Sequence, residues 1–408
     1  MIRPFQPGDT FLLQRLQRQA PKLNVAQALL QPRSPVWAAL TAGNPLHQAK
    51  VATYVLHQNG HGLARSGFVQ AQRRPGRSDV DILMLAPALD TRTGHPAIWE
   101  KLLAHCIVEG TQESTARIYA DVPDQPLLVN TFAHVGFGVY ARQSIWRLAP
   151  NEVANYATQH ASIPALHAAA AQRATGAPTT HVRMAQRSDE WELQRLYARV
   201  TPRAVQRAEG VLVDAGSRPP ILDWWLGGDV QTFVSGDGAG AAEALNGCLR
   251  VVSTRTGVWM QLWADAHRTD ADAAKALLGN ALRFVQNQRR RRPIYIPVRD
   301  YQGGLGPLLS DFGFAPFADH AKMVKHLLQR VVETENVRQL VVEPASEIVV
   351  TAGGYSPPPI RTDSVRGMGG PLLRHRTGSA HTHTAATSST ALRAQGQDVE
   401  QDEAAYRR

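Results

Sequence analysis

Four short blocks of this 408-residue sequence recur in the same order further along the chain. The spacing between each block and its counterpart stays between 175 and 180 residues. One match of this length would arise by chance, whereas four collinear matches at a nearly constant spacing indicate a duplication. A period this long corresponds to two whole domains and not to a solenoid of short repeats. The paired blocks are 3–9 with 183–189, 101–103 with 276–278, 117–122 with 293–298, and 135–140 with 312–317.

Both halves have the same succession of hydrophobic patterns, and this succession predicts a mixed α/β fold. Asp9 and Asp189 precede apolar residues at helical spacing, so we expect each to be the N-cap of the first helix in its half. Segment 57–62 has the composition of a hairpin turn. Each half is expected to end with a helix and a closing strand. The other expected strands are 50–57, 63–72, 80–85 and 116–122, then 230–235, 247–254, 258–263 and 293–298, with helices at 96–109 and 271–287.

The composition along the chain predicts two domains, a linker and a tail. We expect residues 1–148 and 181–330 to form the domains, and residues 149–180, which are rich in Ala, His and Gln, to form the linker. Residues 331–350 are compatible with one extra strand or helix. Residues 351–408 are rich in Gly, Ser, Thr and Arg and lack apolar periodicity, which predicts a disordered tail.

The overall composition is typical of a folded protein. The chain is 43% hydrophobic and 19% charged, which excludes a wholly disordered or collagen-like chain. No run approaches 18 consecutive apolar residues, and the first residues lack the apolar core of a signal peptide, so we expect a soluble cytoplasmic protein without a membrane partner. Two cysteines are too few for a disulfide framework or a four-thiolate zinc site, and we expect no metal.

The net charge of +10 belongs to both halves and is absent from the tail. Residues 1–148 carry +6, residues 181–328 carry +4, and residues 331–408 carry −1. A diffuse excess favours modest attraction to phosphates over a dedicated nucleic-acid arm. The densest run is Arg289–Arg292, directly after the helix expected at 271–287. These cations would complement the helix dipole, and contact with phosphate or RNA is the alternative interpretation.

The order of elements in each half resembles that of the GNAT superfamily of acyl-coenzyme A-dependent N-acyltransferases. Segment 2–9 is similar to the family's first strand and the start of its first helix. Segment 132–140 is similar to its last helix and following strand, where an aromatic residue precedes a Gly-Phe pair, and segment 309–314 repeats the Gly-Phe pair. The resemblance covers 1–148 and 181–328, so it implies two tandem acyltransferase-like domains.

The resemblance implies transfer of an acetyl or acyl group from acyl-coenzyme A to an amine on an unidentified small molecule or peptide, with acetyl-coenzyme A as co-substrate. An opening beside the central strand would expose backbone N–H groups, and the helix N-terminus behind it would bind the pyrophosphate. A carboxylate or a water chain would take the proton of the amine, and a hydroxyl group, often from tyrosine, would serve the leaving thiolate. Backbone N–H groups would hold the developing oxyanion.

The candidate phosphate-binding residues are Arg92, Thr93 and Gly94 in the first half. A glycine there would let a phosphate approach the backbone closely. The loop departs from the family pattern, because it has one glycine and its arginine is two residues upstream instead of three. The loop 265–272 of the second half has no glycine, and Asp270 and Asp272 would repel an anion. An ordinary strand-to-helix connection fits the first loop equally well and the second better.

The candidate catalytic residues are Tyr301 as hydroxyl donor and Glu209 or Asp265 as base. The tyrosine usual in the family falls at Phe132 and Leu309, neither of which can donate a proton. A structural role is the competing interpretation for each candidate. We expect Cys106, which lies among Leu and Ile residues, to be a core residue and not a nucleophile. The adjacent Trp224 and Trp225 either belong to the core or line a cleft.

Three functions are therefore compatible with the sequence. The first, which we favour slightly over the second, is a tandem acyltransferase. One half binds the cofactor, and we favour the first half for this role. The second is a non-catalytic descendant that serves ligand sensing or protein interaction, which the departures at both loops and both tyrosine positions support. The third is a nucleic-acid-associated protein that uses the arginine run, although no aromatic side chains for stacking are interleaved with it.

Overall fold

In the computed structural model, all the residues that it describes lie in one compact unit, Met1–Thr334. Most of the expected hairpin turn, most of the linker and the whole of 328–408 fall outside the described residues. The structure describes residues 1–18, 20–42, 51–57, 66–90, 94–152, 181–212, 218–236, 244–264, 271–288 and 290–327.

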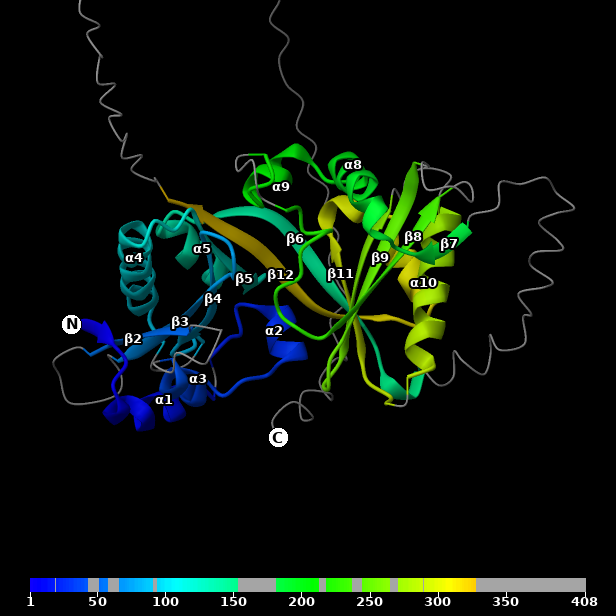
Figure 1. The fold of residues 1–408 in the computed structure, drawn as a ribbon. Helices are drawn as coiled ribbons and strands as arrows, with labels where there is room; N and C mark the ends of the chain where they lie inside the picture. The colour runs from blue at the N-terminus through cyan, green and yellow to red at the C-terminus, as the bar shows by residue number, and fades with distance from the viewer. Residues whose placement is uncertain are drawn as a thin grey trace, which may run out of the picture. The chain divides into compact units, whose positions relative to one another are not determined.

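The first half, here residues 1–152, has the strands and helices that the hydrophobic pattern predicts and, in addition, two short helices between residues 25 and 41 (Figure 1). Its helices are α1 (Thr10–Leu16), α2 (Val25–Leu30), α3 (Pro35–Thr41), α4 (Pro96–Gln112) and α5 (Pro126–His134). Its strands are β1 (Ile2–Pro4), β2 (Val51–Leu56), β3 (Gly67–Arg73), β4 (Asp79–Ala86), β5 (Arg117–Pro123) and β6 (Gly138–Leu148).

The second half, here residues 181–327, repeats this order with two described helices instead of three between its first two strands, and confirms the predicted duplication of the fold. Its helices are α8 (Glu190–Val200), α9 (Arg203–Ala208), α10 (Ala271–Gln286) and α11 (Leu305–Asp311). Its strands are β7 (His181–Met184), β8 (Asp229–Gly236), β9 (Leu245–Ser253), β10 (Val258–Ala264), β11 (Ile294–Arg299) and β12 (Ala315–His326).

The strands of the described residues form one continuous sheet, in the order β1-β2-β3-β4-β5-β12-β6-β11-β10-β9-β8-β7. The two halves exchange their last strands in this sheet. β12 of the second half lies between β5 and β6 of the first, and β6 lies between β12 and β11. The two expected domains therefore share a sheet through an exchange that the hydrophobic pattern does not reveal.

Each half has a core between its long helix and the sheet. Leu102 and Leu103 of α4 pack on the strands of the first half, and Leu277 and Leu278 of α10 pack on those of the second, so the repeated Leu-Leu pair has the same role twice. Cys106 is 6% exposed in the first core, as expected. Burial raises the pKa of its thiol to about 12, so it remains protonated at neutral pH.

The first repeated block forms the same ion pair at the start of each half. The Asp9 carboxylate accepts hydrogen bonds from the two Arg3 Nη atoms at 2.7 and 2.8 Å and from the Gln6 backbone N–H at 2.9 Å. Asp189 repeats this arrangement with Arg183, also at 2.7 and 2.8 Å. The N-cap prediction is therefore only partly right. Both residues occupy the cap position, but neither side chain bonds to its helix, because each carboxylate folds back into a preceding 3₁₀ turn.

These carboxylates predict a loss of stability in acid. The hydrogen bond from Arg183 lowers the pKa of Asp189. Burial alone would raise the pKa of Asp9, but the bonds from Arg3 and Gln6 outweigh it and lower that pKa too. A carboxyl group whose pKa is lower in the folded state stabilises the protein above its unfolded pKa of about 4, and this contribution disappears as the pH falls through the folded value.

We therefore expect Asp189→Asn to lower the free energy of unfolding by ~1–3 kcal/mol at pH 7, because a charged hydrogen-bond acceptor is lost. The difference from wild type should shrink below about pH 4, where the wild-type carboxylate also becomes protonated. Urea denaturation at pH 7 and pH 3 measures both values. Asp311→Asn, at an exposed position of α11, is the matched control. An equal deficit at the two pH values would contradict the ion-pair explanation.

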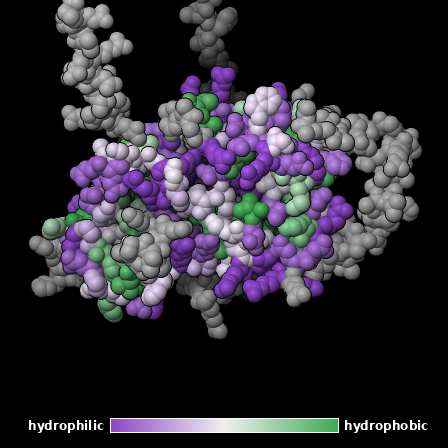
Figure 2. Space-filling view, viewed as in Figure 1, coloured by the Kyte–Doolittle hydropathy of each residue, from purple (hydrophilic) through white to green (hydrophobic). Residues whose placement is uncertain are grey.

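The face of the molecule in Figure 2 is mainly polar, and apolar residues appear on it in small separate patches. In the described part of the chain, every helix is too short or too polar to cross a lipid bilayer.

Candidate functional site

Each half has an opening beside its central strand, as the resemblance implies. β4 and β5 pair in parallel only from Asp79–Arg117 to Asp81–Tyr119, and beyond this point the strands separate. In the second half, β10 and β11 pair in parallel only at 258–259 with 294–295. β4 also has a register shift against β3 that leaves Leu83 without a partner in that pairing, whereas β10 pairs with β9 without interruption.

The opening in the first half is bridged by the backbone of Leu23, in the segment between α1 and α2. The Leu23 N–H donates to the carbonyl of Leu83 on β4 at 2.9 Å, and its carbonyl accepts from the N–H of Asp121 on β5 at 2.8 Å. The Leu23 side chain is 1% exposed in the core of this half. The backbone groups at the apex of the opening are therefore bonded to the chain itself.

The opening in the second half is bridged by a side-chain amide. Gln302 donates from Nε2 to the carbonyl of Leu262 on β10 at 3.0 Å. Its Oε1 accepts from the N–H of Arg299 on β11 at 3.1 Å. An amide group thus spans the separated strands in both halves. Neither residue was a candidate from sequence, because Leu23 acts through its backbone and a lone glutamine after a strand carries no signal.

The glycine of the candidate phosphate loop packs against its own chain. Arg92 and Thr93 lie outside the described residues, and Gly94 is described. A Cβ at position 94 would lie 2.1 Å from the carbonyl oxygen of Ala88, so the close approach that this glycine permits is to Ala88.

The start of α4 also has few free donors. Pro96 has no N–H, and the Ala97 N–H donates to Nδ1 of the N-cap residue His95 at 3.2 Å. The Ile98 N–H donates to the carbonyl of His95 at 2.9 Å. An anion at this helix start would meet donors that are already used.

We expect Gly94→Ala to lower the free energy of unfolding by ~1–3 kcal/mol through overpacking, whether or not any cofactor is present. Urea denaturation measures this. Gly8→Ala is the control, because a Cβ at position 8 would meet nothing within 4 Å. If Gly94→Ala unfolds at the wild-type urea concentration, the packing explanation fails and the glycine is available for a ligand.

A charged cavity lies between the two halves, and both exchanged strands contribute residues to its wall. It encloses about 930 Å³, counting its mouth. Its walls come from the strands β4, β5, β6, β10, β11 and β12 and from the segments around Asn24, Glu209 and Trp224. The ionisable residues that line it, other than tyrosines, are Arg74, Arg77, Arg299, Lys322, Asp81, Asp121, Glu209 and Asp223.

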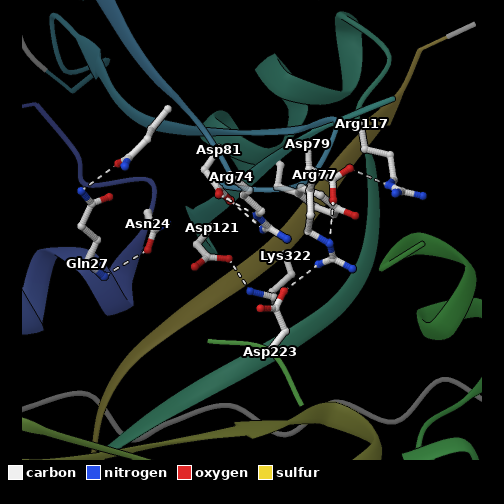
Figure 3. A network of polar contacts seen from close by, with 12 residues as sticks. Asn24, Gln27, Arg74, Arg77, Asp79, Asp81, Arg117, Asp121, Asp223 and Lys322 are labelled. Atoms are coloured by element: carbon white, nitrogen blue, oxygen red, sulfur yellow. Dashed lines mark hydrogen bonds and ion pairs between the residues drawn. The ribbon is translucent and has the colours of Figure 1, made fainter. Parts of the chain in front are cut away.

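The cations and carboxylates of this cavity neutralise one another (Figure 3). Arg74 binds Asp81 through two hydrogen bonds of 2.7 and 2.8 Å, and Lys322 on β12 binds Asp121 on β5 at 2.6 Å. Burial would raise the pKa of Asp121, but Lys322 more than compensates and the pKa lies below its ordinary value. The Lys322 pair also fastens the exchanged strand to the first half.

A second row of ion pairs runs along one side of the cavity. Arg77 lies 3.4 Å from Asp223 and 3.7 Å from Asp79. Asp79 is fully buried and also accepts from Arg117 Nε at 2.9 Å. Because Asp223 belongs to the second half, Arg77 connects the halves electrostatically.

Two of the catalytic candidates meet at one guanidinium group. Arg299 donates to Glu209 Oε1 at 2.6 Å and to the Tyr301 hydroxyl at 2.9 Å. The other oxygen of Glu209 accepts from the hydroxyl of Tyr197. Glu209 is 6% exposed with both oxygens occupied, so it is placed as a partner of Arg299 and not as a free base. The third candidate, Asp265, lies outside the described residues.

Aromatic residues complete the cavity wall. Trp224 and Trp225 both line it, although Trp224 also packs on a small core with Val25 and Leu30. Trp259 on β10 is 3% exposed, and its Nε1 has no hydrogen-bond partner. Gln261, two residues along the same strand, has an unpartnered Oε1. A molecule or a water bound in the cavity would satisfy both atoms.

Comparison with known proteins gives distant structural matches. No protein-family model and no curated protein matches the sequence. A tandem GNAT protein from the clavulanic acid biosynthesis pathway aligns over 80% of this chain and 98% of its own, at 14% identity and a TM-score of 0.42. A GCN5-related N-acetyltransferase from Sphaerobacter thermophilus aligns over 81% and 97%, at 11% identity and 0.44.

A GCN5-related N-acetyltransferase from Anabaena variabilis aligns over 80% of this chain and 73% of its own, at 10% identity and a TM-score of 0.35. These likenesses are remote. The mixed α/β fold with two related halves is therefore established by the strand order and register given above. Within the described residues, no three His, Cys, Asp or Glu side chains are grouped so as to hold a metal ion.

Proposed function

We propose that this chain is an acyltransferase-fold protein that binds a small polar molecule in the cavity between its halves and does not transfer an acyl group. The observation that carries this proposal is the amide that spans the opening beside each central strand. An acyl-transfer site needs backbone donors that are free to hold an oxyanion. At the two apexes the N–H groups of Asp121 and Arg299 already donate within the chain, and the carbonyls of Leu83 and Leu262 already accept, so the openings between the strands are filled by the protein itself.

The cavity supports binding for a separate reason. Its charges are balanced, and its wall presents one unpartnered donor, Trp259 Nε1, and one unpartnered acceptor, Gln261 Oε1. A ligand pocket typically combines aromatic walls with a few polar groups that fix the orientation of the ligand. A neutral or zwitterionic molecule that both donates and accepts hydrogen bonds matches these walls.

Titration of the full-length protein with acetyl-coenzyme A tests the absence of transfer. We expect no release of free thiol from millimolar acetyl-coenzyme A with a panel of amines. Saturable binding together with amine-dependent thiol release would refute a non-catalytic role.

The binding role has its own test. In a thermal-shift screen of amino acids, polyamines and nucleosides, at least one compound is expected to stabilise the wild type. Gln261→Leu is expected to keep the wild-type stability without ligand, because it removes an acceptor that no protein donor uses. The variant should lose the stabilisation by the ligand. A screen without hits, or hits that Gln261→Leu retains, would contradict a site in this cavity.

Acyl transfer in the second half is the second candidate function. It is favoured by Tyr301, whose hydroxyl bonds to the cavity residue Arg299. Burial raises the pKa of Tyr301, although Arg299 offsets part of this effect, so the hydroxyl stays protonated and can donate to a thiolate. Amine-dependent release of thiol from acetyl-coenzyme A separates the two functions, since only this one transfers an acyl group.

A further inference from the structure

A second pocket lies at the far ends of β9 and β10, away from the cavity between the halves. It encloses about 1120 Å³, counting its open side. Its charged residues are Asp229, Arg255, Arg290 and Arg292. Arg255 comes from the turn between β9 and β10, whereas Arg290 and Arg292 come from the arginine run that the sequence singles out. Residues distant in sequence therefore bring three guanidinium groups to one concave surface.

Arg292 is fixed in the pocket wall by the protein. Its guanidinium donates to the carbonyl of Thr254 and to the side chain of Gln288, and its Nε has no partner. The alternative interpretation of the run as a solvated helix cap does not account for this position, because Arg292 bonds to the carbonyl of Thr254 at the β9–β10 turn. Its rotamer is therefore restricted before any ligand arrives, which reduces the entropic cost of binding.

The hydroxyl groups of this wall are already used by the protein. Thr254 Oγ1 donates to the carbonyl of Gly257 at 2.9 Å. Thr256 Oγ1 donates to the carbonyl of Leu30 at 2.7 Å, which ties the turn to α2 of the first half. The strong donors that remain for a ligand are the guanidinium groups, and guanidinium groups prefer planar or tetrahedral oxyanions such as carboxylate and phosphate.

The charges of this pocket are unbalanced, in contrast to those of the cavity between the halves. Three arginines face one carboxylate, Asp229, and within the described residues no ion pair joins Arg255, Arg290 or Arg292 to an acid. Burial and the neighbouring Arg290 lower the pKa of Arg292, although Asp229 offsets part of this effect. An anion would remove this repulsion.

We propose that this pocket binds the phosphate group of a small phosphorylated molecule, with Arg255 and Arg290 as its direct ligands and Arg292 as a fixed third donor. Phosphate matches three guanidinium groups better than carboxylate, because it carries more charge and more acceptor oxygens. A small molecule is favoured over RNA because the site is concave and has no aromatic side chain on which a base would stack. This site is independent of the function proposed above.

Calorimetric titration of the full-length protein with inorganic phosphate, pyrophosphate and AMP tests this assignment. We expect saturable binding of at least one of them, weakened about ten-fold by Arg290→Ala and by Arg255→Ala, as the loss of a charged hydrogen bond requires. The matched control is Arg291→Ala, which removes the same charge from an exposed neighbour that does not line the pocket. This control should change the affinity by less than two-fold.

The three probes distinguish the source of the phosphate. Strongest binding of AMP favours a phosphorylated organic ligand, and strongest binding of pyrophosphate or phosphate favours a free oxyanion, and both results support the pocket. Equal losses in Arg290→Ala and Arg291→Ala would overturn it, because binding would then reflect the run as a whole. Tighter binding of a 12-nucleotide RNA than of all three probes, or no binding at 10 mM, would also overturn it. Melting temperatures without ligand verify that each variant is folded.

Discussion

Truncation of the chain before Ala315 is expected to unfold both halves and not only the second. β12 pairs with β5 over Arg117–Pro123 on one side and with β6 over Gly138–Arg147 on the other. Ala321 and Met323 of β12 are fully buried in the core of the first half. A typical domain is stable by only ~5–15 kcal/mol, so loss of a strand that pairs on both sides and enters the core is expected to be sufficient to unfold it.

Far-UV circular dichroism and size exclusion measure this effect. The control is truncation after Thr334, which ends the compact unit and retains β12. The control is expected to keep cooperative unfolding. A soluble chain of residues 1–314 with protected backbone amides in β2–β5 would show that the first half folds without the exchanged strand.

The exchange also predicts how the halves behave as separate polypeptides. Chains covering 1–152 and 181–334 should each be insoluble alone, because β5 and β6 would lack β12, and β11 would lack β6. When the two are co-expressed, they should purify as a one-to-one complex. Separate soluble halves that do not associate would be inconsistent with the shared sheet.

Replacement of Arg117 by Met is expected to lower the free energy of unfolding by ~3–5 kcal/mol, because it leaves a buried carboxylate without its close partner. Arg117 is 4% exposed and donates to Asp79, which is 0% exposed. The guanidinium also fits against Gly210 of the second half, where a Cβ would lie 2.2 Å from Nη1. The pair therefore supports the contact between the halves.

A double-mutant cycle isolates the ion pair. Arg117→Met together with Asp79→Leu is expected to be more stable than Arg117→Met alone, since no unpaired charge then remains buried. Arg207→Met, at an exposed site of α9, controls for the change in net charge. Additive losses in the double variant, measured by urea denaturation, would mean that the two side chains contribute independently.

The order of strands and helices could be predicted from the sequence repeat. The same hydrophobic pattern occurs twice, so the assignment of each element in one half supports the assignment in the other. It also identified Arg3–Asp9 and Arg183–Asp189 as corresponding positions, although it assigned the carboxylates to the wrong partner. The strand exchange could not be predicted in this way. The hydrophobic pattern marks β6 and β12 as strands but does not show which strands they pair with.

Less of the candidate site could be predicted, because its residues meet only in the folded chain. Glu209 and Tyr301 were chosen separately, and their common partner Arg299 lies 90 residues from Glu209 in the chain. The bridging role of Leu23 depends only on backbone atoms, so no residue type signals it. Trp259 and Gln261 share one face of an expected strand, but the pattern does not say that this face borders a cavity.

The shared sheet also has a consequence for synthesis of the chain. β12 ends at His326, about 180 residues after β6 ends at Leu148. At a translation rate of ~5–20 residues per second, the nascent first half would wait roughly 9–36 s for the strand that completes it. During this interval the edges of β5 and β6 remain unpaired as the ribosome continues. Chaperone binding to nascent chains is therefore expected to be strongest after Leu148 has been synthesised and before His326 has been.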